Sequence, residues 1–215
     1  MTVLMEPDKN CHICPRLVEF RNDNRSSEPT WHNSPVASFG TTESEFLIVG
    51  LAPGLRGANR TARPFTGDAA GILLYPTLQK FGWANGIFSE DGRDTLKLTN
   101  CRITNAVRCV PPKNRPIGAE IRNCQKFLRS EIAYMRNLRV ILALGTVAHN
   151  AILDSLHIRR RAHPFKHAQF HQLAEALTLV DSYHCSRYNV NTGRLTKQMF
   201  HDVVQAMKCY IEETE

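Results

Sequence analysis

The stretch "FLIVGLAPGLRGANRTARPFTGD", from Phe46 to Asp68, contains the two features that decide the fold. Its first five residues, 46–50, are mainly apolar and predict a buried strand. The loop that follows, 51–68, holds three glycines, three arginines and a terminal aspartate. Loops of more than about 12 residues are usually functional or disordered, and the patterning argues against disorder. The loop is therefore expected to wrap around a ligand.

Strand-like and helix-like segments alternate along the rest of the chain. Further strands are expected at 98–107, 138–144 and 176–183, and helices at 69–82, 118–137, 145–156 and 195–213. Pro76 is expected to kink or break the first helix, and Thr146 to cap the third. The alternation predicts an α/β fold, a three-layer sandwich with a central four-stranded parallel sheet. The polar, turn-rich residues 1–45 are expected to form an irregular, cysteine-bearing segment.

Length and composition narrow the class of protein. A chain of 215 residues suits a single domain, 1–215. No segment approaches the roughly 18 uninterrupted apolar residues of a membrane span, and the N-terminus lacks the features of a secretory signal. Seven cysteines, an odd number, argue against a disulfide framework. These features predict a soluble, cytoplasmic protein without a membrane partner, and we expect a monomer.

The net charge of +7 is concentrated in one part of the chain. Between residues 102 and 167, thirteen Lys and Arg stand against three Asp and Glu. Such asymmetry favours a polyanionic partner, and nucleic acid is the commonest one. A basic face that serves only solubility is the alternative.

Three loops are expected to meet at one edge of the sheet, because ligands of parallel α/β sheets bind at the carboxyl ends of the strands. These loops follow the first, second and fourth strands, at 51–68, 105–116 and 184–194. Each is rich in Gly, Pro, Asn or Arg. The third strand leads almost at once into a helix.

Residues of the long loop have two possible roles each. Asp68 is expected to cap the helix that follows and, compatibly, to hold a carboxylate in a glycine-shaped pocket facing a reacting centre or a water. Phe65 is either a core residue or a stacking platform for a planar ligand. Arg60 and Arg63 are either solvated or in contact with phosphate.

Two polar residues lie at the ends of the other strands. The amide of Asn105 can donate and accept at once, so it can read the edge of a base, or it can satisfy the loop backbone. His184 directly follows the fourth strand, a position that favours a catalytic role as much as a structural one.

Four of the seven cysteines are spaced like metal ligands. Cys11 and Cys14 form a C-x2-C pair, and Cys109 and Cys124 are separated by a Pro-rich loop and part of a helix. Four cysteines suit zinc or an iron–sulfur cluster. Alternatively, Cys109 and Cys124 are small buried apolar residues.

Three motifs together resemble those of the uracil-DNA glycosylase superfamily. They are "GLAPGLRGANRTARPFTGD" (50–68), "NAVRCVPPKNRP" (105–116) and "SYHCSRYNVNTGRLT" (182–196). Leu51 replaces the acidic residue usual in family 4, so the chain looks most like family 5, the iron–sulfur type B enzymes. Two departures are Gly54, where the family commonly has Ala, and Cys185, where it commonly has Pro. Losing that proline frees φ and is expected to hold His184 less rigidly.

This resemblance implies excision of uracil, and of other deaminated bases such as hypoxanthine and xanthine, from single- or double-stranded DNA, leaving an abasic site. The base is flipped into a pocket, where Phe65 stacks on it and Asn105 bonds its edge. His184 would donate to a base oxygen, with help from N–H groups near Ala52. Asp68 would stabilise the cationic sugar or orient the water.

The resemblance also implies a 4Fe-4S cluster. The cluster ligands would be Cys11, Cys14, Cys109 and Cys124. The position of the last loop, next to His184, separately predicts contact with DNA, and an ordinary surface loop is the alternative. In the loop 186–194, Tyr188 and Val190 are candidate wedges that fill the space left by the flipped base. Arg187 and Arg194 would hold flanking phosphates.

Two rival functions explain fewer of these sequence features. A non-catalytic nucleic-acid-binding protein with a four-cysteine zinc site explains the charge and the cysteines, but not Asp68 and His184 at strand ends. A nucleotide-binding enzyme would need a phosphate loop of the form G-x-x-x-x-G-K-S/T, and the loop 51–68 lacks it.

Overall fold

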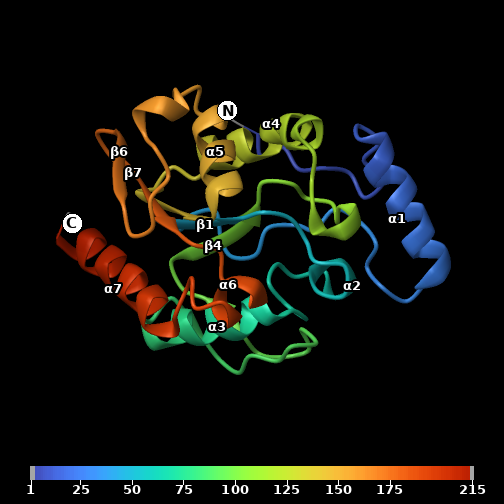
Figure 1. Ribbon diagram of the computed structural model, residues 1–215, viewed down its shortest axis with the longest axis horizontal. Coiled ribbons are helices and arrows are strands. Elements are labelled where there is room, and N and C mark those ends of the chain that lie inside the picture. The colour runs from blue at the N-terminus through green and yellow to red at the C-terminus, as the bar shows by residue number, and fades with distance from the viewer. Residues whose placement is uncertain (1–2, 214–215) are drawn as a thin grey trace.

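The computed structural model describes residues 3–213, and Figure 1 shows its central sheet between layers of helices. Four strands form the expected parallel sheet: β1 (Phe46–Gly50), β4 (Cys101–Asn105), β5 (Val140–Leu144) and β7 (Leu177–Ser182). A fifth strand, β6 (Phe170–Ala174), pairs antiparallel with β7, so the order is β4-β1-β5-β7-β6. The prediction of four strands missed β6, because its sequence "FHQLA" has neither an apolar run nor a strict alternation.

Strand β1 shows how the two cores form. All five of its residues are buried, and successive side chains point to opposite faces. Phe46 and Ile48 belong to one apolar cluster, and Leu47 and Val49 to the other. The first cluster is covered by α3 (Ala69–Lys80) and α7 (Lys197–Glu213), and the second by α4 (Gly118–Tyr134) and α5 (Thr146–Ser155). The predicted three-layer sandwich is therefore confirmed.

Two expectations about helices, a break at Pro76 and a cap by Thr146, were wrong. Pro76 does not break α3, which is continuous from Ala69 to Lys80. Proline has no N–H, so Pro76 leaves the carbonyl of Ile72, four residues earlier, without its helical hydrogen bond. Both residues are exposed, so water can bind that carbonyl. Thr146 does not cap α5, because the capping position is Gly145, with φ of +90°. The chain turns there in a conformation that favours glycine.

The N-terminal segment is less irregular than expected. It contains α1 (Pro15–Ser27), with proline at the start, where its missing N–H costs nothing. The buried residues of α1 are Leu17, Arg21 and Asn24. Only one of them is apolar, so the sequence has no apolar periodicity that would predict this helix.

Short elements connect the layers. The expected strand 98–107 is divided, because Asn100 has φ of +48° and interrupts the extended backbone between β3 and β4. The short connecting elements are α2 (Ala58–Thr61), β2 (Ala84–Asn85), β3 (Lys97–Leu98), the 3-10 turns at Pro112–Asn114 and Arg160–Ala162, and α6 (Arg187–Asn191). Among residues 3–213, no helix is both long enough and apolar enough to cross a bilayer.

The strand order places a crevice at the carboxyl edge of the sheet. After β1 the chain passes to β4 on one side, and then crosses to β5 on the other. At such a switch point the following loops diverge and leave room for a ligand.

Candidate active site

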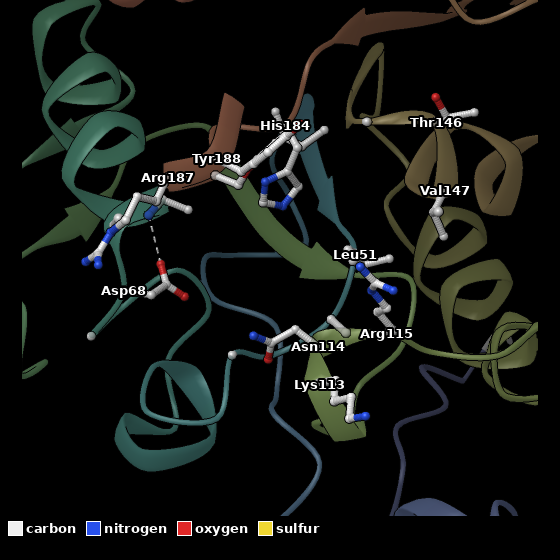
Figure 2. Close-up of a pocket in the computed structure, with 18 residues that line it drawn as sticks. Leu51, Asp68, Lys113, Asn114, Arg115, Thr146, Val147, His184, Arg187 and Tyr188 are labelled. Atoms are coloured by element: carbon white, nitrogen blue, oxygen red, sulfur yellow. Dashed lines mark hydrogen bonds between the residues drawn. The ribbon is translucent and has the colours of Figure 1, made fainter. Parts of the chain in front are cut away.

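A cleft of about 760 Å³ opens at this edge of the sheet, as Figure 2 shows. The expected convergence of the loops after β1, β4 and β7 is observed, since all three line the cleft. The start of α5 after β5 lines it as well, through Gly145, Thr146 and Val147. Sequence reasoning passed over this segment because it is short. The sequence feature that could have indicated this part of the cleft is Gly145, a glycine directly at the carboxyl end of a strand.

A smaller pocket of about 30 Å³ adjoins the cleft and shares several lining residues with it. Its walls include five of the predicted site residues: Ala52, Phe65, Asp68, Asn105 and His184. The structure thus brings together side chains that lie more than 130 residues apart in the sequence.

Asp68 is the N-cap of α3, as expected. Its Oδ1 accepts hydrogen bonds from the backbone of Ala70 at 3.1 Å and Gly71 at 3.3 Å. Its Oδ2 faces two glycines, and a Cβ built on Gly57 would lie 2.7 Å from it. Burial raises the pKa of Asp68, while the two backbone bonds oppose that rise. One oxygen therefore fixes the carboxylate, and the other is left for a ligand.

Gly50 allows Phe65 and Asn105 to approach each other. A Cβ at Gly50 would overlap both the Asn105 amide oxygen and the Phe65 ring. Asn105 is buried at the end of β4, paired in register with Gly50. Phe65 has φ of +54°, a left-handed conformation that costs about 1–3 kcal/mol for a residue other than glycine.

Contacts of the two preceding residues hold Phe65 in this conformation. Arg63 forms a two-pronged ion pair with Asp94, at 2.7 and 2.6 Å. The Tyr75 hydroxyl donates to the carbonyl of Pro64 at 2.5 Å. The guanidinium of Arg63 is thus engaged away from the cleft, which leaves its expected phosphate contact without support.

Arg60 also lies outside the cleft lining. It is exposed on α2, and its Nε donates to the carbonyl of Arg56 at 3.0 Å. Its expected phosphate contact stays a prediction.

His184 projects into the cleft as a neutral imidazole. Burial lowers the pKa of His184 to about 4. Its Nδ1 is buried and has no hydrogen-bond partner within residues 3–213. The ring centroid lies 6.0 Å from that of Phe65. Asn189 donates to the His184 carbonyl at 2.8 Å, a bond that opposes the loosening expected from Cys185.

Cationic side chains lie on two rims of the cleft (Figure 2). Arg187 and Tyr188 come from α6, and Tyr188 is 72% exposed. Lys113 and Arg115 come from the segment between β4 and α4, where Lys113 has φ of +55°. Sequence reasoning missed these two, although "PPKNRP" is a turn-rich, basic string. Arg194 lies over the Tyr183 ring at 4.7 Å, outside the cleft lining.

The four predicted cysteine ligands lie around one small cavity. Cys109 and Cys124 are buried, and Cys11 and Cys14 are partly buried. N–H groups point at three of the sulfurs: Arg108 N at Cys124 (3.4 Å), Asn123 Nδ2 at Cys14 (3.5 Å) and Arg21 Nη1 at Cys109 (4.0 Å). Such donors are typical partners of metal-bound thiolates.

The electrostatics of this cysteine site fit a bound metal group. Burial, reinforced by the neighbouring thiols, raises the pKa of Cys109 to about 12 and that of Cys124 to about 11. Thiolates would therefore need a metal to persist there. Arg21 is only 3% exposed and forms no ion pair with a carboxylate of the described chain. A buried cation without a carboxylate fits an anionic group held by the sulfurs.

Sulfur spacing favours a group larger than one ion. Around tetrahedral zinc, Zn–S bonds of about 2.3 Å bring the sulfurs to about 3.8 Å from one another. Among residues 3–213, no three cysteine sulfurs lie within 4.8 Å of one another. The donor set of four cysteines at wider spacing fits a 4Fe-4S cluster.

Comparison with known proteins places the chain in a family. The family model described as "Uracil DNA glycosylase superfamily" matches residues 37–208. The chain is 44% identical over 204 residues to the type-5 uracil-DNA glycosylase of Thermus thermophilus, covering 92% of both chains. It is 38% identical over 200 residues to that of Pyrobaculum aerophilum, covering 91% of this chain and 87% of the relative. A type-4 enzyme of P. aerophilum is 32% identical over 152 residues, covering 70% and 63%. The chain belongs to the uracil-DNA glycosylase superfamily, in its type-5 branch.

Proposed function

We propose that this protein excises uracil from DNA by hydrolysing the N-glycosidic bond, leaving an abasic site. The observation that carries the proposal is the gathering of Phe65, Asp68, Asn105 and His184 around one small pocket. The relatives' names support the same activity.

The pocket residues suit recognition of a flipped base. The Phe65 ring offers an apolar face on which a planar base stacks. Asn105 presents an amide that donates to one atom of the base edge and accepts from another. Gly50 permits the approach of both side chains, so a side chain at position 50 would close the pocket.

Asp68 and His184 suit bond cleavage. In the transition state, positive charge builds on the sugar and negative charge on the leaving base. The free Oδ2 of Asp68 stabilises the sugar cation or orients the attacking water, and the helix cap keeps it from rotating away. His184 donates an N–H to a base oxygen as a neutral imidazole, because its pKa is held far below neutral pH.

The rims suit a nucleic-acid backbone. Arg187 on one rim, with Lys113 and Arg115 on another, would contact phosphates flanking the flipped nucleotide. Tyr188 and Val190 are exposed on α6 and would fill the space vacated in a duplex. We expect the enzyme to act as a monomer on DNA in the cytoplasm.

The cysteines would hold a 4Fe-4S cluster through Cys11, Cys14, Cys109 and Cys124. When bound, the cluster would cross-link two distant segments of the chain. It would tie the start of α1 to the loop that follows Asn105, and so fix the base-reading strand end.

A direct test uses purified protein and a labelled duplex with one uracil. Incubation followed by alkali should break the strand at the uracil, and Asp68→Asn should remove most of the cleavage. Binding of the DNA without cleavage by the unaltered protein would favour the non-catalytic alternative and overturn the proposal.

A second arm tests the wider substrate range. Duplexes with hypoxanthine or xanthine should also be cleaved, and Asn105→Ala should change the ranking of the three bases. Cleavage of uracil alone would restrict the function to uracil, and an unchanged ranking would remove Asn105 from base reading.

A further inference from the structure

A second cluster of metal-type ligands lies apart from both the cleft and the cysteine site. His149 is on α5, His171 on β6 and Asp181 on β7, and all three are buried. Asp181 Oδ1 lies 2.6 Å from His149 Nδ1, and Oδ2 lies 3.0 Å from His171 Nε2. Within residues 3–213 this is the only set of three such ligand atoms within 4.8 Å of one another. The proposed glycosylase chemistry uses none of them.

The surroundings of His149 require a positive charge in this cluster. Its Nε2 lies 2.8 Å from the carbonyl oxygen of His163, which can only accept, so Nε2 carries a proton. A neutral His149 then has a lone pair on Nδ1. That lone pair would face a carboxylate oxygen of Asp181 at 2.6 Å, and two acceptors at this distance repel. A proton shared by the two atoms accounts for the 2.6 Å distance, and a metal ion would replace that proton, with the two ligand atoms moving apart to make room for it.

The donor set fits a metal ion. Two imidazole nitrogens and one carboxylate oxygen are typical ligands of zinc and of other divalent first-row transition metals. Ligating histidines usually donate their other N–H to a carbonyl or carboxylate, as His149 does to His163. The backbone N–H of Lys166 donates to Asp181 Oδ2 at 3.1 Å and orients the carboxylate.

One member of the cluster borders a hollow at the surface. His171 lines an open hollow of about 460 Å³, with Phe165, Lys166 and Gln169 among its other walls. The His163 ring lies edge-on to His171, with centroids 5.6 Å apart. Water entering from this hollow would complete a four-coordinate site.

We propose that the protein binds one divalent transition-metal ion of the zinc class through His149, His171 and Asp181. The ion would join α5, β6 and β7. Because Asp181 precedes His184 by three residues on the same strand end, the ion would stiffen the segment that carries the catalytic histidine. The site does not depend on the glycosylase proposal.

Cobalt(II) titration of the purified protein, with its cysteine site loaded, tests this site. Difference spectra report the ligands, because nitrogen and oxygen ligation gives visible d–d bands without the sulfur-to-cobalt charge-transfer band of thiolates. One equivalent should bind per chain with no thiolate band. His171→Gln and Asp181→Asn should each weaken binding at least tenfold, whereas the exposed His157→Asn should not.

If a variant is too unstable for the cobalt titration, the effect of zinc on the melting temperature provides a second test. Zinc should raise the melting temperature of the unaltered protein in a concentration-dependent way, and should leave that of His171→Gln unchanged. No cobalt uptake, uptake with a thiolate band only, or equal affinity in all variants would overturn the proposal. The cluster would then be an imidazolium–carboxylate pair.

Discussion

The cleft and the cysteine site both lie near the end of β4, yet they differ in size, in enclosure and in the polar contacts around them. The cleft is open, with a volume of about 760 Å³, and the cysteine cavity is much smaller and more enclosed. Asn105 ends β4 at the small pocket beside the cleft, and four residues later Cys109 lines the cysteine cavity. An open site suits a ligand exchanged in every turnover, and a closed one suits a group that stays.

The two sites also treat polar atoms differently. In the cleft, His184 Nδ1 has no partner among the described residues. Beside the cysteines, Arg108 and Arg102 bind the two oxygens of buried Glu131 at 2.5 and 2.6 Å. Burial alone would raise the pKa of Glu131, but the two arginines outweigh it and lower that pKa. His184 Nδ1 is thus left for a substrate, whereas the two ion pairs of Glu131 hold the scaffold beside the cysteines.

The largest effect is expected at the closed site. Cys109→Ser should remove the brown colour, the bound iron and most of the soluble protein together, because the site has no spare ligand. Iron analysis and visible absorption measure this, with the exposed Cys209→Ser as a matched control. Stoichiometric zinc without iron, in protein made anaerobically with ample iron, would contradict the cluster.

At the open site, Asp68→Asn should slow single-turnover excision by about 10²–10³-fold, in line with removal of one transition-state-stabilising group. Asparagine caps helices as well as aspartate does, so the melting temperature and DNA affinity should change little. An unchanged rate would reduce Asp68 to a helix cap, and a collapsed melting temperature would make its role structural.

A smaller effect is expected on the rim. Tyr188→Ala combined with Val190→Gly should lower excision from paired duplex by about tenfold, because unstacking costs a few kcal/mol. Excision from single strands should stay near that of the unaltered protein. Equal losses on both substrates would mean that α6 shapes the pocket instead.

The smallest effect is expected from pH near neutrality. His184 has a folded-state pKa of about 4, against about 6.5 when unfolded, so it stays neutral as pH falls from 8 to 6. Single-turnover excision should be flat over that range and should fall only in acid, where Asp68, whose pKa is raised, gains a proton. A step near pH 6.5 that His184→Asn abolishes would contradict the buried, neutral imidazole.

The same shift has a consequence for stability. Because the unfolded chain binds a proton at His184 below about pH 6.5 and the folded chain does not until about pH 4, stability falls as pH falls through that window. Denaturant titrations at pH 7 and pH 5 should show a smaller fall for His184→Asn than for the unaltered protein.

Local sequence patterns predicted most of the scaffold. The apolar run at β5 and the alternation of strands with helices indicated the parallel sheet, because burial on both faces requires such runs. Elements without that signal were missed. β6 is an edge strand of mixed composition, and α1 buries Arg21 and Asn24 beside a single leucine. Their stability comes from contacts that are distant in sequence.

For the site, spacing and residue type were enough to single out Asp68, Asn105, His184 and the four cysteines, because glycine-rich loops and strand ends are local features. Only the tertiary structure decided which groups face the ligand. It paired Arg63 with Asp94, brought Lys113 and Arg115 to a rim, and left His184 Nδ1 unpartnered. It also joined His149, His171 and Asp181, which three separate elements contribute. Burial and distance between such residues depend on packing, and no local pattern in a chain encodes them.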